Sequence, residues 1–182
     1  KNLLPEVLSS VSWQRLALQQ PDFAKAHLTG IDLRDSDLQE ANFCGADLTG
    51  ARFNAACLKG ACFDGAILMG ADLEYSDLAG ASFKEANLQK ANLNNIKLLD
   101  ADFYKTDLCG SEPSWSKIDI TQAKNWRQAT MLPEVKARLL AEHGPGPGGL
   151  RVLMLIWEME PVVSGGGWTA AYHFIKNLSR KG

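Results

Sequence analysis

The strongest constraint in this 182-residue sequence is a five-residue period that runs without an insertion from Pro21 to Gly110. The eighteen units of this stretch all have Leu or Phe at the third position, and twelve of them begin with Ala. A period of five matches neither the 3.6 residues of an α-helical turn nor the two-residue alternation of a β-strand. In an α-helix, residues five apart lie about 140° apart, so the Leu and Phe side chains would be spread around the surface. The period therefore predicts a solenoid in which the first and third positions of each unit point inward.

The spacing of the phenylalanines predicts the number of sides in each coil. Six units have Phe at the third position, and in five of these units the phenylalanines fall at multiples of twenty residues from one another. A coil of four five-residue sides would stack these five rings in one ladder along the axis, whereas a coil of three sides would scatter them. The predicted core ladder consists of Phe23, Phe43, Phe63, Phe83 and Phe103.

These units resemble the A-(D/N)-L-x-x pattern of the pentapeptide-repeat family. The resemblance implies that family's all-β solenoid, a right-handed quadrilateral β-helix, which we expect over residues 21–120. Some members of the family are DNA mimics that bind type II topoisomerases through outward rows of acidic residues. The resemblance thus offers a topoisomerase as one candidate partner.

The flanking segments are expected to cover the two ends of the solenoid, where unpaired backbone would otherwise be exposed. Apolar residues and an early proline predict an N-terminal helical cap over residues 1–20. Beyond residue 120 the repeat is lost, and residues 121–143 are expected to form a C-terminal helical cap with a short helix over 133–142. Trp126 and Met131 are expected to lie across the last coil.

A linker rich in Gly and Pro over residues 144–149 precedes a segment of different composition. Residues 150–182 combine an apolar run, a glycine-rich loop and a helical spacing, which predict a strand–loop–helix fragment. Such a fragment is the opening half of a Rossmann-like βαβ unit, truncated after its first helix. The alternative interpretation is an unrelated α/β fragment.

The fragment also resembles the start of a GT-B glycosyltransferase of the glycogen-synthase-like type. This resemblance implies that its glycine loop would lie beside the phosphates of a nucleotide sugar, because backbone amides at a helix N-terminus favour anions. A GT-B enzyme needs two complete Rossmann-like domains, and a single β-α unit cannot hold a nucleotide. The candidate loop residues are Ser164, Gly165, Gly166 and Gly167.

Positions two, four and five of each unit are expected to face solvent. Over residues 21–110 the sequence has fourteen Asp and Glu against eight Lys and Arg, and the acids are spread over all four predicted sides. We interpret this as an ordinary solvated surface, and a DNA-like row of acids is the alternative. Asp at position two also has a local use, since its carboxylate can accept backbone N–H bonds at the corners.

A few outward positions carry large apolar side chains and form a candidate surface for a protein partner. The alternative is that scattered apolar groups on a surface need no explanation. The candidate residues are Ile67, Met69, Tyr75, Leu99 and Tyr104.

Four cysteines, Cys44, Cys57, Cys62 and Cys109, form no C-x-x-C pair, and their spacings match no zinc motif. We expect reduced thiols and a cytoplasmic location. His27, Cys44 and Cys57 fall on different predicted sides and cannot converge, so the sequence predicts no catalytic residue, cofactor or metal site.

Charge and hydropathy exclude further classes of function. The net charge of −2 offers no general attraction for nucleic acid or an anionic membrane. The longest apolar run, Val152 to Trp157, is six residues, far short of the ~20 that span a bilayer. The prediction is a non-catalytic protein-interaction module of unknown client, and the alternatives are an accessory domain of a GT-B glycosyltransferase and a topoisomerase-binding DNA mimic.

Overall fold

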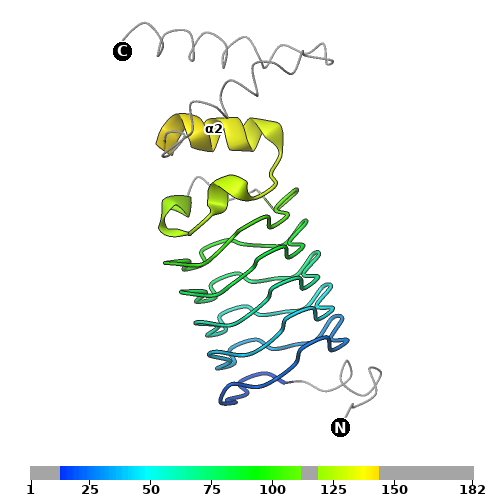
Figure 1. The fold of residues 1–182 in the computed structure, drawn as a ribbon. Coiled ribbons are helices and arrows are strands. Elements are labelled where there is room, and N and C mark those ends of the chain that lie inside the picture. The colour runs from blue at the N-terminus through cyan, green and yellow to red at the C-terminus, as the bar shows by residue number, and fades with distance from the viewer. Residues whose placement is uncertain (1–12, 112–118, 144–182) are drawn as a thin grey trace, which may run out of the picture. The chain divides into compact units, whose positions relative to one another are not determined.

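The computed structural model describes residues 13–111 and 119–143. From residue 13 to residue 111 the chain winds in stacked coils, each built from four five-residue sides (Figure 1). Position two of each unit forms a parallel bridge with the residue twenty positions further along, from Ala17 with Asp37 to Asn87 with Asp107. Each unit therefore lies directly on the unit four places earlier in the chain, as the spacing of the phenylalanines predicts.

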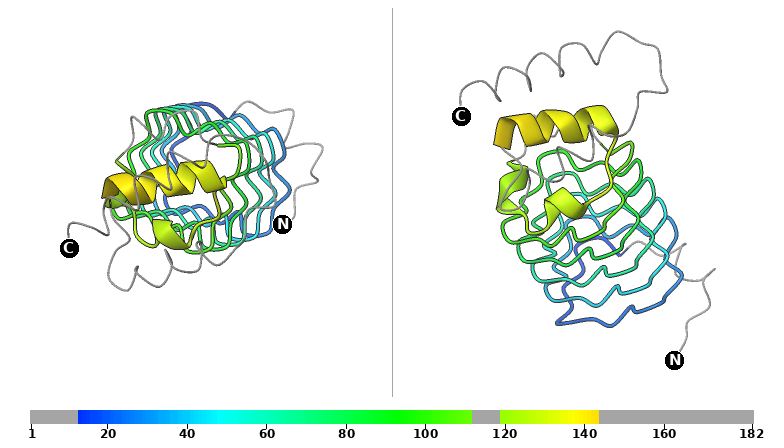
Figure 2. Two further views of the ribbon diagram at one scale, coloured as in Figure 1. Left: turned by 90° about the horizontal axis from the view of Figure 1, so that it is seen from above. Right: turned by 45° about the horizontal axis from the view of Figure 1, so that its top comes forward.

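The four sides surround a single interior when this part of the chain is viewed along its axis (Figure 2). They are numbered here by the first residues of their units. Side 1 has units beginning at 21, 41, 61, 81 and 101, side 2 at 26, 46, 66, 86 and 106, side 3 at 31, 51, 71 and 91, and side 4 at 36, 56, 76 and 96.

The first and third positions point into this interior. Between Ile31 and Leu108 every residue at these two positions is buried. The first position is usually Ala, and where a hydroxyl replaces the methyl group, it is satisfied internally. Ser76 Oγ donates to the carbonyl of Leu73, and Thr106 Oγ1 donates to the carbonyl of Phe83, both at 2.6 Å. The interior is thus apolar with its few polar groups hydrogen-bonded.

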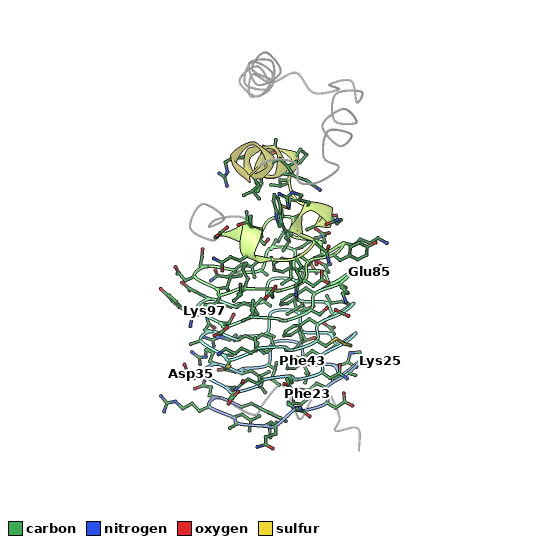
Figure 3. The ribbon with its side chains drawn as sticks, turned by 60° about the vertical axis from the view of Figure 1, so that its left-hand side comes forward. Phe23, Lys25, Asp35, Phe43, Glu85 and Lys97 are labelled. Atoms are coloured by element: carbon green, nitrogen blue, oxygen red, sulfur yellow. A yellow bond between two sulfur atoms is a disulfide. The ribbon has the colours of Figure 1, made fainter. Side chains whose placement is uncertain are left out.

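The five phenylalanines of side 1 stack in one column. Successive ring centroids from Phe23 to Phe103 lie 5.2, 5.0, 4.8 and 5.4 Å apart. Phe53, on side 3, meets two of these rings edge-on at 5.7 and 6.0 Å. Figure 3 shows Phe23 and Phe43 on successive coils, with Lys25 and Asp35 toward opposite edges of the view. The column runs without a break from Phe23 to Phe103.

The corners between sides require a left-handed backbone. The fifth residue of every unit from 21 to 110 has a positive φ. Eight of these eighteen residues are Gly, which adopts this conformation without a steric penalty. The fifth position was expected only to face solvent, although its frequent glycines are a signal for a left-handed corner.

The structure corrects the expected N-terminal helical cap over residues 13–20. Ala17 bridges Asp37, Trp13 N donates to the carbonyl of Asp32, and Arg15 has φ 57°, so these residues form two further units of the solenoid. Their third positions are Trp13 and Leu18. Leu16 replaces the usual Ala at a first position, where it is only half-buried because the coil is the outermost one described. The other residues of the expected cap, 1–12, lie outside the described part.

The C-terminal end of the solenoid also differs from the expected boundary at 120. Two short 3₁₀ helices, η1 (Ile120–Gln122) and η2 (Trp126–Gln128), alternate with extended residues that bridge the last coil. Lys124 pairs with Asp102 and Thr130 with Asp107. This half-coil buries Trp126 and Met131. Residues 121–131 therefore continue the stack, although the five-residue pattern has ended.

The chain divides into two compact units, Lys1–Leu132 and Pro133–Gly182. The second unit begins with helix α2 (Pro133–His143), which confirms the helix expected over 133–142. Its function as a cap stays a prediction. The linker over 144–149 and the strand–loop–helix fragment over 150–182 lie outside the described residues.

Candidate functional site

Aspartates at position two serve the local backbone. Their carboxylates accept the backbone N–H of the residue two positions later at 3.0–3.2 Å, as the sequence predicts. In the units that have it, this bond closes the turn at the end of the side. The aspartates concerned are Asp22, Asp47, Asp72, Asp77, Asp102 and Asp107.

Asp32 on side 3 is the centre of a polar cluster that joins three coils. Arg34 donates two hydrogen bonds of 2.8 Å to its carboxylate, and Gln14 of the preceding coil donates one of 2.7 Å. Arg52 of the following coil lies 3.9 Å away. The Arg34 side chain is the main reason that the pKa of Asp32 lies far below its ordinary value.

Other acids of the solenoid are paired with lysines of neighbouring coils. Asp77 on side 4 lies 3.5 Å from Lys59 and 3.7 Å from Lys97, and the three residues line a shallow groove with Leu99 and Gln122. Similar pairs on side 1 join Asp102 to Lys84 and Glu85 to Lys105.

The charge is also divided almost equally among the four sides. Over residues 21–110 each side carries a net charge of −1 or −2. In Figure 3 basic and acidic side chains, such as Lys25 and Glu85, project from the same side 1. This distribution favours a mixed solvated surface over an uninterrupted row of acids.

The five candidate residues for a partner surface do not gather on one side. Ile67 and Met69 project together from side 2, where they occupy positions two and four of one unit and are 42% and 39% exposed. The remaining three residues are exposed, but each lies on a different side: Tyr75 at the end of side 3, Leu99 on side 4 and Tyr104 on side 1. The structure therefore reduces the candidate surface to the Ile67–Met69 pair.

The expectation of four reduced thiols is wrong for two of them. Cys44 and Cys62 form a disulfide with their Cα atoms 5.6 Å apart. Cys57 and Cys109 are outside this bond. The spacing of these two cysteines matches no zinc motif and is too long for a short-range pair, so it indicates a bond only when it is compared with the coil. In a twenty-residue coil, position four of one unit is a diagonal neighbour of position two of the unit stacked on it, eighteen residues later.

Among residues 13–111 and 119–143 there is no group of three or more His, Cys, Asp or Glu side chains that could hold a metal ion. The same ranges contain no helix long and apolar enough to cross a membrane. The glycine loop of Ser164, Gly165, Gly166 and Gly167 lies outside them, so its expected place beside a nucleotide sugar stays a prediction.

A coiled backbone with a register of twenty residues and inward Leu or Phe defines a repeat solenoid of the four-sided type. The family model for pentapeptide repeats matches eight copies over residues 26–65 and 66–108. Residues 26–108 therefore match the pentapeptide-repeat family, and their four-sided coil agrees with the quadrilateral β-helix expected from the sequence. No curated protein matches the chain.

Solved structures of pentapeptide-repeat proteins are similar to the chain over part of its length. The protein alr5209 from Nostoc PCC 7120 is 28% identical, with 64% of this chain and 85% of that chain covered and a TM-score of 0.39. HetL, a protein of the same cyanobacterium involved in the regulation of heterocyst differentiation, is 27% identical, with 64% and 56% covered and a TM-score of 0.31. AT2G44920 from the thylakoid lumen of Arabidopsis thaliana is 20% identical, with 78% and 82% covered and a TM-score of 0.30.

Proposed function

We propose that this chain is a rigid, non-catalytic module that binds a protein partner through side 2 of its solenoid. The observation that carries the proposal is the exposed Ile67–Met69 pair on a side whose other outward residues are mostly polar. The backbone of side 2 is held by hydrogen bonds to the coils on both sides, for example Leu48 N to the carbonyl of Ile67 at 2.7 Å. A partner would thus meet a preformed surface, which reduces the entropy lost on binding.

Crosslinking with the 182-residue chain tests this proposal. A photoreactive residue at Thr49 or Gln89, the neighbours of the pair on side 2, would report a partner bound there. We expect one partner to be crosslinked by the wild type and lost in the double variant Ile67→Ser, Met69→Ser. The matched control is Leu99→Ser on side 4, which should keep the crosslink. An equal yield in all three proteins, or no crosslink from either position, would contradict the proposal.

A second candidate is an accessory domain in front of a GT-B glycosyltransferase. Its support is the resemblance of residues 150–182, which lie outside the described part. Two Rossmann-like domains encoded after residue 182 would support it, and a reading frame without them would contradict it.

The third candidate is a DNA mimic for a type II topoisomerase. The paired acids and the low net charge of each side argue against it. We therefore expect micromolar protein neither to inhibit gyrase supercoiling nor to relieve quinolone poisoning. Either effect would favour this candidate over the proposed module.

A further inference from the structure

One side-chain contact recurs along the solenoid and joins position four of a unit to position two of the unit stacked on it, eighteen residues later. Gln14 donates to Asp32 at 2.7 Å and Gln89 to Asp107 at 2.6 Å across this diagonal. Salt bridges use the same diagonal, with 3.5 Å between Lys59 and Asp77. The Cys44–Cys62 disulfide is the covalent member of the series.

The backbone, rather than the disulfide, brings the two cysteines together. Phe43 N donates to the carbonyl of Cys62 at 2.7 Å, and Cys62 N donates to the carbonyl of Ala41 at 2.9 Å. The carbonyl of Cys44 accepts from Lys25 N at 2.9 Å. Since noncovalent pairs occupy the same diagonal in other coils, the two thiols should stay adjacent in the folded, reduced chain. Adjacent thiols have a high effective concentration for forming a disulfide.

The bond closes a covalent ring around one coil. The chain leaves side 1 at Cys44, follows sides 2, 3 and 4, and returns to side 1 at Cys62. A solenoid opens from its ends, coil by coil, because each coil contacts only its neighbours. Opening that starts at the N-terminal edge cannot pass Cys44 while that residue is bonded to the next coil.

We propose that Cys44 and Cys62 form a reversible redox lock, which stops opening from the N-terminal edge at the coil containing Cys44. A dithiol reductant opens the lock: its thiolate attacks one sulfur, a mixed disulfide forms, and its second thiol displaces the cysteine. The two cysteines take up two electrons and two protons, and the reductant becomes a disulfide. Both cysteines are only half-buried, so a reductant can reach them. A disulfide such as oxidised glutathione closes the lock by the reverse exchange.

Thiol counting tests the chemistry of the lock. The 182-residue chain, unfolded without reductant, should show two titratable thiols, at Cys57 and Cys109. After reduction and refolding, oxidised glutathione should remove two thiols again, with a loss of two mass units and no glutathione retained at Cys44 or Cys62. Four thiols before reduction, or glutathione retained on these cysteines, would overturn the proposal.

Amide hydrogen exchange tests the mechanical effect. Reduction should speed exchange in residues 45–61 by at least about tenfold, while residues 81–103 stay unchanged, because these later coils also open from the C-terminal edge, which the bond does not restrain. Cys44→Ser and Cys62→Ser should show the fast rates with or without reductant. Cys57→Ser, outside the bond, should respond to reductant as the wild type does. Equal exchange of residues 45–61 in the oxidised and reduced wild type would overturn the lock.

Discussion

At the scale of single residues, the stability of the solenoid depends most on buried side chains whose space no neighbouring side chain can fill. Phe63 is completely buried, and its ring stacks between Phe43 at 5.0 Å and Phe83 at 4.8 Å. Rings above and below it are held by their own coils and cannot collapse into a vacated site. The interior is therefore expected to leave a cavity when such a ring is removed.

Phe63→Ala is predicted to lower the free energy of unfolding by about 3–5 kcal/mol, from the lost burial and the remaining cavity. Lys59→Ala is the control, since its exposed contact with Asp77 is expected to contribute less than about 0.5 kcal/mol. Denaturant unfolding of both variants measures the difference. Equal midpoints for the two variants would contradict the assignment of Phe63 to the core.

The corner residues give a test of backbone conformation. Gly65 has φ +65°, and a Cβ added there would meet no atom within 4 Å, so Gly65→Ala tests the conformation alone. We expect a loss of about 1 kcal/mol, because the left-handed strain exceeds the gain from a less flexible unfolded chain. The reverse change, Ala55→Gly at φ 57°, should stabilise the protein by about 0.5 kcal/mol. Melting temperatures that move in the same direction for both variants would be inconsistent with this explanation.

At the scale of the coil, main-chain bonds and diagonal side-chain contacts join each turn to the next. The carboxylate of Asp32 contacts both neighbouring coils, because it accepts a hydrogen bond from Gln14 of the preceding coil and lies near Arg52 of the following coil. Its pKa is lowered in the folded protein, chiefly by Arg34. The stabilisation that follows is present above the unfolded pKa of about 3.9 and is lost as the pH falls toward the folded pKa.

Asp32→Asn is therefore predicted to make stability less sensitive to acid. Between about pH 4 and pH 2 the melting temperature of the variant should fall less steeply than that of the wild type, because one carboxylate with a lowered pKa has been removed. Asp37→Asn is the control, since the Asp37 carboxylate accepts a bond from Gln39 rather than from a cation. It should retain the acid sensitivity of the wild type. Parallel melting curves for Asp32→Asn and the wild type across this range would refute the prediction.

At the scale of the whole solenoid, stability should depend on the apolar interior far more than on the surface charges. The lysines of the ion pairs are half-exposed or more, for example 51% for Lys59 and 75% for Lys97. Exposed pairs of this kind contribute little and are screened by salt. Raising sodium chloride from about 50 mM to about 500 mM should change the melting temperature by less than about 3 °C. A decrease of about 10 °C would instead assign a major part of the stability to the ion pairs.

The repeat itself was sufficient to predict the interior of the solenoid. Each inward position must fill the same space in every coil, so its residue type recurs at a fixed spacing that a single sequence displays. The small first position, the Leu or Phe third position and the column from Phe23 to Phe103 all follow from this condition. The same reasoning failed at the edges, where Leu16 departs from the Ala pattern and the half-coil at Trp126 loses the period.

The surface was decided by tertiary structure. Outward positions obey no common packing condition, so their residue types vary, and which of them meet depends on the stagger between stacked coils. That stagger joins Cys44 to Cys62, gathers three polar partners around Asp32 and leaves only Ile67 and Met69 together among the exposed apolar residues proposed for partner binding. The five-residue pattern determined what is inside this protein, whereas the register of one coil on the next determined which side chains can act together outside it.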